Sequence, residues 1–351
     1  MEPFKSAEAG KIILLTGGCG FLGTSIIMEL LDETSPLPVK ELRVIDLKPP
    51  RQDIIQRISY IQGDIRDKEL VEKSCKGVDL VIHAAAIVDW GTKSTDEIMS
   101  VNYSATRIII EACRANHVKY LVYTSSLDVL YDGTPLVNVD ENSPYPDHHS
   151  TSYCRSKYLA ERLVLEANDE TLTTCSIRPS DIYGEADPYH IGSLVKMAKG
   201  GFYVRLGNGK SKCQHVYVGN IACAHVLAAA ALVKGNNVLA GQSYFITDGP
   251  GLNFFTFFDS IVEGAGYRIW PKNLWLPRWL AYGIGAVSEF IALLVRPVKR
   301  YSPKMSRFAV TYTCTDYTFN SDKAREDFNF IPKYDKEEAF SRTVIYFIPK
   351  D

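Results

Sequence analysis

A glycine-rich turn near the N-terminus constrains the fold of this chain more than any other feature. The apolar run Ile12–Leu15 ends in Thr16, glycines follow at positions 17, 20 and 23, and an apolar, helix-like segment begins at once. This pattern predicts a strand, a tight turn and a helix. A turn without side chains lets the backbone approach a diphosphate closely, and the first N–H groups of the helix supply positive potential. The sequence therefore predicts a βαβ unit that binds a dinucleotide.

An acidic residue after the next predicted strand supports this interpretation. The run Glu41–Ile45 is followed by Asp46, about twenty residues after the last glycine of the turn. A carboxylate there accepts hydrogen bonds from an adenosine ribose. Because a 2′-phosphate would meet this carboxylate with a repulsion of ~1 kcal/mol or more, we expect NAD rather than NADP. Lys48 would offset part of that repulsion.

Apolar strand-like runs alternate with helical stretches through the first half of the chain. The runs are Lys11–Thr16, Glu41–Asp46, Ile58–Gln62, Leu80–His83, Tyr120–Thr124 and Thr173–Arg178, and the helical stretches are Phe21–Asp32, Lys68–Cys75, Asp96–Ala115 and Tyr153–Ala167. Such alternation is typical of a parallel sheet that helices cover on both faces. We therefore predict an α/β protein with a doubly wound parallel Rossmann sheet in residues 1–184.

Prolines and glycines break the second half of the chain into shorter elements. They include Pro188, Gly192, Gly200 and Gly207. We place a smaller C-terminal substrate lobe in residues 185–351, with residues 216–232 returning to the main sheet as a helix.

Charge and cysteine content exclude several classes of protein. The chain has 39 basic and 41 acidic residues, so it lacks the basic excess of a nucleic-acid-binding protein. Its 8 cysteines form no CxxC pair, and most lie in apolar runs. We therefore expect free thiols in a reducing compartment. The His148-His149 pair has no further ligands at metal spacing, so no metal site is expected.

Tyr153 and Lys157 lie one turn apart in a predicted helix. Positions i and i+4 share a helix face, so the Lys157 ammonium is expected to lower the pKa of the Tyr153 phenol from its ordinary value near 10. Such a tyrosine can act as a base near neutral pH. Upstream, the strand Tyr120–Thr124 runs into Ser125 and Ser126. Their hydroxyls would lie at the carboxyl edge of the sheet, where ligands bind in open α/β folds.

Together these features resemble the extended short-chain dehydrogenase/reductases. The segments that carry the resemblance, in chain order, are the TGGCGFLG turn, Asp64-Ile65, His83-Ala84-Ala85-Ala86, Thr124-Ser125-Ser126, the Tyr153 and Lys157 pair, and Arg178-Pro179-Ser180-Asp181-Ile182-Tyr183-Gly184. The segment from Val216 to His225 and the C-terminal part look like the 3β-hydroxysteroid dehydrogenase branch. The resemblance covers nearly the whole chain.

The resemblance implies a role for individual residues. Tyr153 would be the catalytic base, Lys157 would lower its pKa and hold the nicotinamide ribose, and Ser126 would orient the substrate oxygen, with Ser125 as the alternative. The other implied cofactor-binding residues are Gly17, Gly20, Phe21, Leu22 and Gly23 at the diphosphate, Asp46 at the adenosine ribose, Asp64 and Ile65 at the adenine, and Ala84, Ala86 and Pro179 along the cofactor cleft.

The resemblance also implies a reaction, the NAD-dependent oxidation of a 3β-hydroxysteroid to the 3-ketosteroid. Steroidogenic members of the family then move a double bond from Δ5 to Δ4. That step needs a second acid–base carboxylate, for which Asp128 and Asp248 are the candidates. Asp248 lies in Thr247-Asp248-Gly249-Pro250, a sequence typical of a turn.

Other functions stay open. One is a decarboxylating sterol-4α-carboxylate 3-dehydrogenase, and another is a non-catalytic membrane scaffold that binds NAD. A nucleotide-sugar epimerase is disfavoured, because an apolar segment at residues 279–295 would have no role with a soluble, charged sugar nucleotide.

This apolar segment carries a single charge, Glu289. Spanning a bilayer takes about 20 apolar residues, and a charge near the centre is costly. We therefore expect a membrane-associated helix that lies in, or dips into, one leaflet. Trp270, Trp275 and Trp279 suit the interface, and the flanking basic residues are Arg278, Arg296, Lys299 and Arg300. The alternative is a buried core helix of the substrate lobe.

Location and partners follow from the resemblance and the apolar segment. We expect the protein at the endoplasmic reticulum membrane, with its active domain in the cytosol, and we expect a steroid or sterol as its substrate. We also expect a homodimer paired through the helices Asp96–Ala115 and Tyr153–Ala167.

Overall fold

The main sheet has seven parallel strands. The structure is a computed structural model that describes residues 10–89, 93–295 and 305–349. The strand order is β11-β7-β5-β4-β1-β2-β3. The bounds are β1 (Lys11–Thr16), β2 (Val39–Asp46), β3 (Ser59–Gln62), β4 (Leu80–His83), β5 (Tyr120–Thr124), β7 (Thr173–Pro179) and β11 (Gln242–Ile246). The predicted α/β class and doubly wound Rossmann sheet are confirmed, and all six expected strands lie in this sheet.

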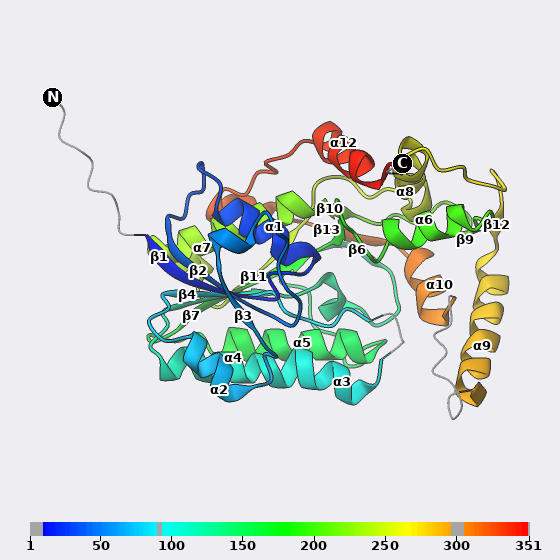
Figure 1. Cartoon of the computed structure of the whole chain (residues 1–351). Coiled ribbons are helices and arrows are strands. Elements are labelled where there is room, and N and C mark those ends of the chain that lie inside the picture. Colours follow the sequence, from blue (N-terminus) through cyan, green and yellow to red (C-terminus); the bar gives the residue numbers. More distant parts are fainter. Residues whose placement is uncertain (1–9, 90–92, 296–304, 350–351) are drawn as a thin grey trace.

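Helices cover both faces of the sheet (Figure 1). One layer contains α1 (Phe21–Leu30) and α7 (Val218–Val233), and the other contains α2 (Lys68–Ser74), α4 (Ala105–Ala115) and α5 (Ser152–Glu166). Successive residues of β1 point to opposite faces, so Ile13 and Leu15 pack into the α1/α7 layer while Leu14 packs into the other. Burial on both faces explains why these strands are continuous apolar runs.

The chain returns to the sheet in its second half. The helix expected over residues 216–232 is α7, which packs against α1, β5 and β7. The edge strand β11, which was not predicted, pairs with β7. The domain boundary at residue 184 stays a prediction.

The helix expected over Asp96–Ala115 is interrupted. It consists of α3 (Thr95–Met99), a π turn η2 (Ser100–Ser104) and α4. The buried side chain of Asn102 lies in the π turn.

The remaining elements lie outside the seven-stranded sheet and its two helix layers. They are η1 (Ile55–Arg57), η3 (Leu127–Leu130), β6 (Leu136–Val139), β8 (Asp181–Tyr183), α6 (Ile191–Lys199), β9 (Arg205–Leu206), β10 (His215–Tyr217), η4 (Asn237–Leu239), α8 (Phe254–Gly264), β12 (Trp275–Leu276), α9 (Arg278–Val295), α10 (Arg307–Thr313), β13 (Tyr317–Phe319), α11 (Asp322–Phe328) and α12 (Lys336–Phe347). Strand pairs β10-β8, β12-β9 and β13-β6 tie them together. The buried aromatics Phe254, Phe255 and Phe258 form part of their core.

Helix α9 stands at the edge of the molecule beside α10 (Figure 1). Only Ala281 and Gly285 of α9 are buried, and Trp279 is 76% exposed. The alternative of a buried core helix is therefore wrong. By its length and composition, α9 could cross a membrane, and it is the one helix among the described residues that could. Arg296, Lys299 and Arg300 lie outside the described residues.

The one charge inside the apolar segment faces α10 rather than the exposed side. Glu289 Oε2 lies 2.6 Å from Arg307 Nε, and the Arg307 N–H donates to Glu289 Oε1 at 2.8 Å. A Cβ on Gly285 would lie 3.0 Å from the Arg307 nitrogen, so a larger residue would push α10 away. Glu289 thus serves the contact with α10, and the large exposed side chains of α9 include Leu280, Val287, Phe290, Ile291, Leu293 and Leu294.

Candidate active site

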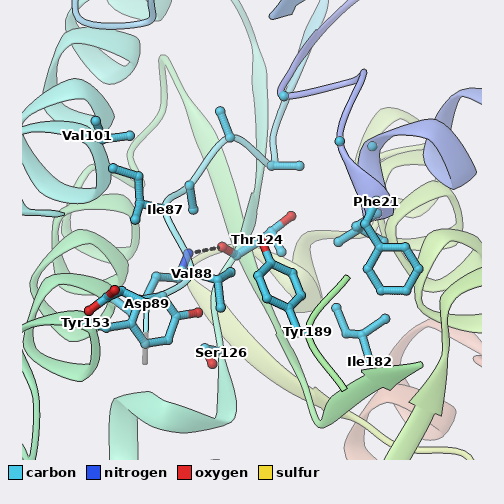
Figure 2. Close-up of a pocket in the computed structure, with 18 of the residues that line it drawn as sticks. Phe21, Ile87, Val88, Asp89, Val101, Thr124, Ser126, Tyr153, Ile182 and Tyr189 are labelled. Atoms are coloured by element: carbon cyan, nitrogen blue, oxygen red, sulfur yellow. Dashed lines mark hydrogen bonds between the residues drawn. The ribbon is translucent and has the colours of Figure 1, made fainter. Parts of the chain in front are cut away.

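A cavity of about 500 Å³ opens at the carboxyl edge of the sheet. All fourteen predicted site residues line it: Gly17, Gly20, Phe21, Leu22, Gly23, Asp46, Asp64, Ile65, Ala84, Ala86, Ser126, Tyr153, Lys157 and Pro179. Figure 2 shows Tyr153, Thr124 and Ser126 on one side of the cavity, with Phe21 and Ile182 across from them. The structure therefore brings the residues expected at a dinucleotide and those expected at a substrate into one site.

The glycines of the turn leave no room for side chains. Gly17 has φ 72°, and a Cβ there would lie 2.7 Å from the Ala85 Cα. A Cβ on Gly23 would lie 2.1 Å from the Gly17 carbonyl oxygen, because α1 begins directly against the turn. At Gly17 and Gly23 only backbone therefore faces the cavity, which suits a diphosphate.

Asp46 is held by the turn itself. Its Oδ2 accepts the Cys19 N–H at 2.9 Å, and its Oδ1 accepts the Lys48 N–H at 2.9 Å. Asp64, after β3, pairs with Arg66, and this guanidinium lowers the pKa of the carboxyl. Both carboxylates thus have fixed positions on the cavity wall.

Lys157 is buried beneath the cavity and points toward β5. Its Nζ donates to the Thr124 carbonyl oxygen at 2.5 Å and lies 4.4 Å from the centre of the Tyr123 ring. Burial lowers its pKa to about 7.

Tyr153 is also buried, and its pKa differs from the sequence-based expectation. Burial, and then the nearby Asp128 carboxylate, raise the pKa of Tyr153 well above its ordinary value, while a hydrogen bond with Ser126 acts in the opposite direction. The expectation of a phenol acidified by Lys157 is therefore wrong for these side chains by themselves, because desolvation exceeds the effect of a neighbouring ammonium.

Ser126 binds a second carboxylate of the cavity, that of Asp128. Its Oγ donates to Asp128 Oδ2 at 2.6 Å. Burial raises the pKa of Asp128 to about 6. Ser125 also lines the cavity, but the hydrogen bond to Asp128 distinguishes Ser126.

The two candidate carboxylates for double-bond migration lie in different places. Asp128 lines the cavity. Asp248 accepts the Tyr217 N–H at 2.6 Å and the Asn220 amide at 3.1 Å, which fixes the start of α7. Asp248 is not among the described residues that line the cavity.

Sequence analysis missed a polar group on the lobe side of the cavity. The Tyr312 hydroxyl of α10 donates to Asp181, which begins β8. His190 lies 3.9 Å from Asp181 and 3.6 Å from Asp187. Burial opposes protonation of His190, but Asp187 and Asp181 raise its pKa to about 9.

Asn102 in the π turn is a further missed residue, and it ties three segments together. Its amide exchanges hydrogen bonds with the Ile87 backbone at 2.7 and 2.9 Å and donates to Ser156 Oγ of α5 at 3.0 Å. The loop after β4 and the helix with Tyr153 are thereby held in register. π turns occur frequently at functional sites, and a polar Asn inside an amphipathic helix is the sequence signal that would have found it.

Comparisons with known proteins agree with this site. The model of the 3-beta hydroxysteroid dehydrogenase/isomerase family matches residues 14–278. The human protein called 3 beta-hydroxysteroid dehydrogenase type 7 is 36% identical over 363 residues, which cover 97% of each chain. The chain belongs to this family. It is thus an oxidoreductase of the short-chain dehydrogenase/reductase type, and the suspected resemblance is confirmed.

Further relatives agree in sequence and in fold. The zebrafish (Danio rerio) short-chain dehydrogenase/reductase family 42E member 1 is 35% identical over 340 residues, which cover 93% of this chain and 86% of the relative. A dTDP-glucose 4,6-dehydratase from Streptomyces venezuelae, solved with NAD and TYD bound, superposes with TM-score 0.75 at 19% identity, covering 96% of each chain. A UDP-glucose 4-epimerase from Thermotoga maritima has TM-score 0.71 at 21% identity, covering 96% of this chain and 98% of the epimerase. At these identities the two structures show the shared fold.

Proposed function

We propose that this member of the family oxidises the 3β-hydroxyl of a steroid with NAD. The observation that carries the proposal is the shared cavity: the glycine turn and Asp46 line the same cavity as Ser126, Tyr153 and Lys157. The names of the relatives support a steroid substrate.

The cavity fits a nicotinamide dinucleotide. The turn could not accommodate side chains at Gly17 or Gly23, and Asp46 lines the cavity beside the turn, where its carboxylate would accept hydrogen bonds from the adenosine ribose. Since both Asp46 oxygens are held by backbone N–H groups, the charge cannot easily move aside for a 2′-phosphate. We therefore propose NAD rather than NADP. Bound NAD accepts a hydride.

The chain's own residues orient the substrate and move its proton. Ser126 and Tyr153 both line the cavity, and their hydroxyls bind the 3β-hydroxyl. Tyr153 then takes the proton of that hydroxyl as the hydride leaves carbon 3. Lys157, fixed on Thr124 and lining the same cavity, would hold the nicotinamide ribose.

Migration of a Δ5 double bond is a second candidate activity. The position of Asp128 on the cavity favours it over Asp248 as the proton carrier. The test supplies a Δ5-3β-hydroxysteroid and NAD and follows the absorbance of the conjugated enone. A product that stops at the unconjugated ketone removes this activity and leaves the oxidation standing.

A membrane surface is the proposed source of the substrate. Phe308 and Tyr312 of α10 line the cavity, and α10 packs on α9, whose outer side is apolar. A sterol that leaves a lipid leaflet beside α9 therefore meets the wall of the cavity. We propose the endoplasmic reticulum membrane, with the active domain in the cytosol, as the location.

Self-association is a separate proposal. We propose that the chain forms a homodimer through α4 and α5, which lie side by side on one face of the sheet (Figure 1). The molar mass in solution, measured by light scattering in detergent, tests it: a monomeric mass would remove the proposal.

One experiment separates the proposed substrates. A panel of 3β-hydroxysteroids, with and without a 4α-carboxylate, is incubated with NAD and then with NADP while NAD(P)H fluorescence is recorded. Turnover only of the carboxylated sterols would replace the first proposal with a decarboxylating dehydrogenase. Cofactor binding without turnover of any steroid would support a scaffold.

A further inference from the structure

Two large aromatic side chains outside α9 are exposed close to each other. Phe202, between α6 and β9, is 54% exposed, and Trp270, between α8 and β12, is 52% exposed. The Tyr203 N–H donates to the Trp270 carbonyl oxygen at 2.8 Å, so the backbone next to Phe202 is tied to that of Trp270. Exposed apolar side chains that gather in one place with a polar rim are typical of a surface that binds a partner or a membrane.

The segments that carry these aromatic residues lead directly to α9. Strands β9 and β12 pair in parallel just after Phe202 and Trp270, and α9 begins at Arg278, shortly after β12 ends. Figure 1 shows β9 and β12 at the same edge of the molecule as α9. Trp279, in the first turn of α9, is 76% exposed. The aromatic pair is therefore continuous with the exposed apolar side chains of α9.

The same segments carry an excess of positive charge. In residues 196–206 and 259–278, the exposed charged side chains are Lys196, Lys199, Arg268, Lys272, Arg278 and Glu263. The Lys199 ammonium lies 5.3 Å from the centre of the Tyr267 ring, which places it beside the segment with Trp270. Among the described residues, no salt bridge involves Lys199, Arg268 or Lys272.

The remaining charged pair of these segments is neutralised within the fold. Arg205 Nε lies 2.6 Å from Asp259 Oδ2, and both side chains are largely buried. The Arg205 guanidinium also donates to the Lys272 carbonyl oxygen at 2.6 Å. Arg205 and Asp259 thus hold the segment with Trp270 in place, while the exposed basic side chains stay available for an external anion.

We define the aromatic–basic face as Lys199, Phe202, Arg268, Trp270 and Lys272. We propose that this face binds an anionic phospholipid surface, as a second membrane contact beside α9. Tryptophan rings favour the level of the lipid headgroups, and each Lys or Arg close to an anionic leaflet strengthens binding about fivefold. The inference extends the proposed membrane location, and it does not depend on which steroid the cavity takes.

Flotation of the full chain with two kinds of vesicle tests the proposal. One kind is phosphatidylcholine alone, and the other is equal parts of phosphatidylcholine and phosphatidylserine. The wild type is expected to bind the anionic vesicles more tightly. The triple variant Lys199→Gln, Arg268→Gln and Lys272→Gln should bind the anionic vesicles about 100-fold more weakly than the wild type, and phosphatidylcholine vesicles as before. Phe202→Ser with Trp270→Ser should weaken binding to both.

A matched control removes the same charge elsewhere. Lys73, Lys76 and Lys119 are exposed basic residues on other elements, and their triple change to Gln should leave the affinity for both vesicles at the wild-type value. Thermal unfolding checks that each variant is folded. Vesicle binding is measured without substrate or cofactor, so failure of the proposed steroid oxidation would leave its result intact.

Four results would overturn the proposal. Equal affinity of the wild type for both vesicles would show that the protein does not select anionic lipid. If the triple variant of the face keeps the full preference for phosphatidylserine, other basic residues cause it. Equal losses in this variant and in the control would assign the effect to total charge. A dimer that Phe202→Ser with Trp270→Ser dissociates, without any difference between the vesicles, would show that a second copy of the chain covers the face.

Discussion

At the scale of a single residue, a variant of Tyr153 distinguishes an enzyme from a scaffold. Tyr153→Phe removes one hydroxyl from the cavity and leaves the ring. We expect steroid oxidation to fall by about 10²–10⁴-fold, because the proton transfer is lost, while NAD binds as before. NADH fluorescence measures the rate, and titration with NAD measures the affinity. Tyr203→Phe is a control, since this buried tyrosine donates to Asp259 away from the cavity lining. Equal turnover by wild type and Tyr153→Phe would contradict the proposed function.

Asp46 is expected to determine which dinucleotide binds. Asp46→Asn removes the negative charge and keeps an oxygen for the Cys19 N–H. The ratio of kcat/KM for NADP to that for NAD is expected to rise about tenfold, which corresponds to ~1.4 kcal/mol of removed repulsion. Initial rates with each cofactor at saturating steroid give the ratio. An unchanged ratio would mean that another group sets the preference.

Sequence reasoning located the residues of the site better than it described their chemistry. The glycine turn and the Tyr153 and Lys157 pair are short-range signals, and the parallel sheet brings strand ends to one edge, so these residues meet in the cavity. Tyr312 and Asp181 are far apart in the sequence, and no local pattern indicates that they touch. The pKa of Tyr153 was misjudged because burial cannot be read from the spacing of two residues.

At the scale of elements, a buried ion pair fixes α5 on the sheet. Glu161, one turn beyond Lys157, accepts from Arg178 of β7 at 2.8 Å, and both side chains are buried. Arg178 lowers the pKa of Glu161 although burial opposes this. Glu161→Gln would leave the guanidinium without its charge partner, and we expect a loss of about 3–5 kcal/mol of unfolding free energy. Urea unfolding measures it.

The pH dependence of stability follows from the same pair. The pKa of Glu161 is lower in the folded protein than in the unfolded chain. Its contribution to the free energy of unfolding is therefore complete at a pH above its ordinary pKa, and it is lost as the pH falls through the pKa of the folded protein. The double variant Glu161→Gln with Arg178→Met should recover stability, since no charge is then left buried alone. If Glu161→Gln alone is as stable as the wild type, contacts other than this ion pair hold α5 on the sheet.

The pattern of apolar residues predicted strands and helices well where these alternate regularly along the chain. Six strands of the sheet were expected because each is an apolar run between helices. The seventh, β11, lies among the glycine- and proline-rich segments of the second half, where the alternation of strands and helices that identified the other six is lost. The π turn was missed because its one sequence signal is the polar Asn102, and no proline or glycine marks the place.

At the scale of the whole molecule, α10 connects the exposed helix α9 to the cavity. One end of α10 is held by Glu289 through Arg307, and further along Tyr312 reaches Asp181 in the cavity wall. The apolar side of α9 and the substrate site are thus separated by one short helix. This arrangement supports the proposed sterol substrate and membrane location, because a sterol that leaves a leaflet beside α9 would not need to cross water to reach the site.

The apolar side of α9 is expected to bind lipid. Phe290 and Leu294 are 60% and 62% exposed, and burying two such side chains contributes roughly 3–6 kcal/mol. The double variant Phe290→Ser with Leu294→Ser should therefore bind phosphatidylcholine vesicles at least about 100-fold more weakly in a flotation assay, while oxidising a water-soluble 3β-hydroxysteroid at the wild-type rate. Val137→Ser with Ile331→Ser is the matched control, since these side chains are 65% and 68% exposed on other elements. Equal loss of vesicle binding in both double variants would mean that general hydrophobicity, rather than α9, directs the protein to membranes.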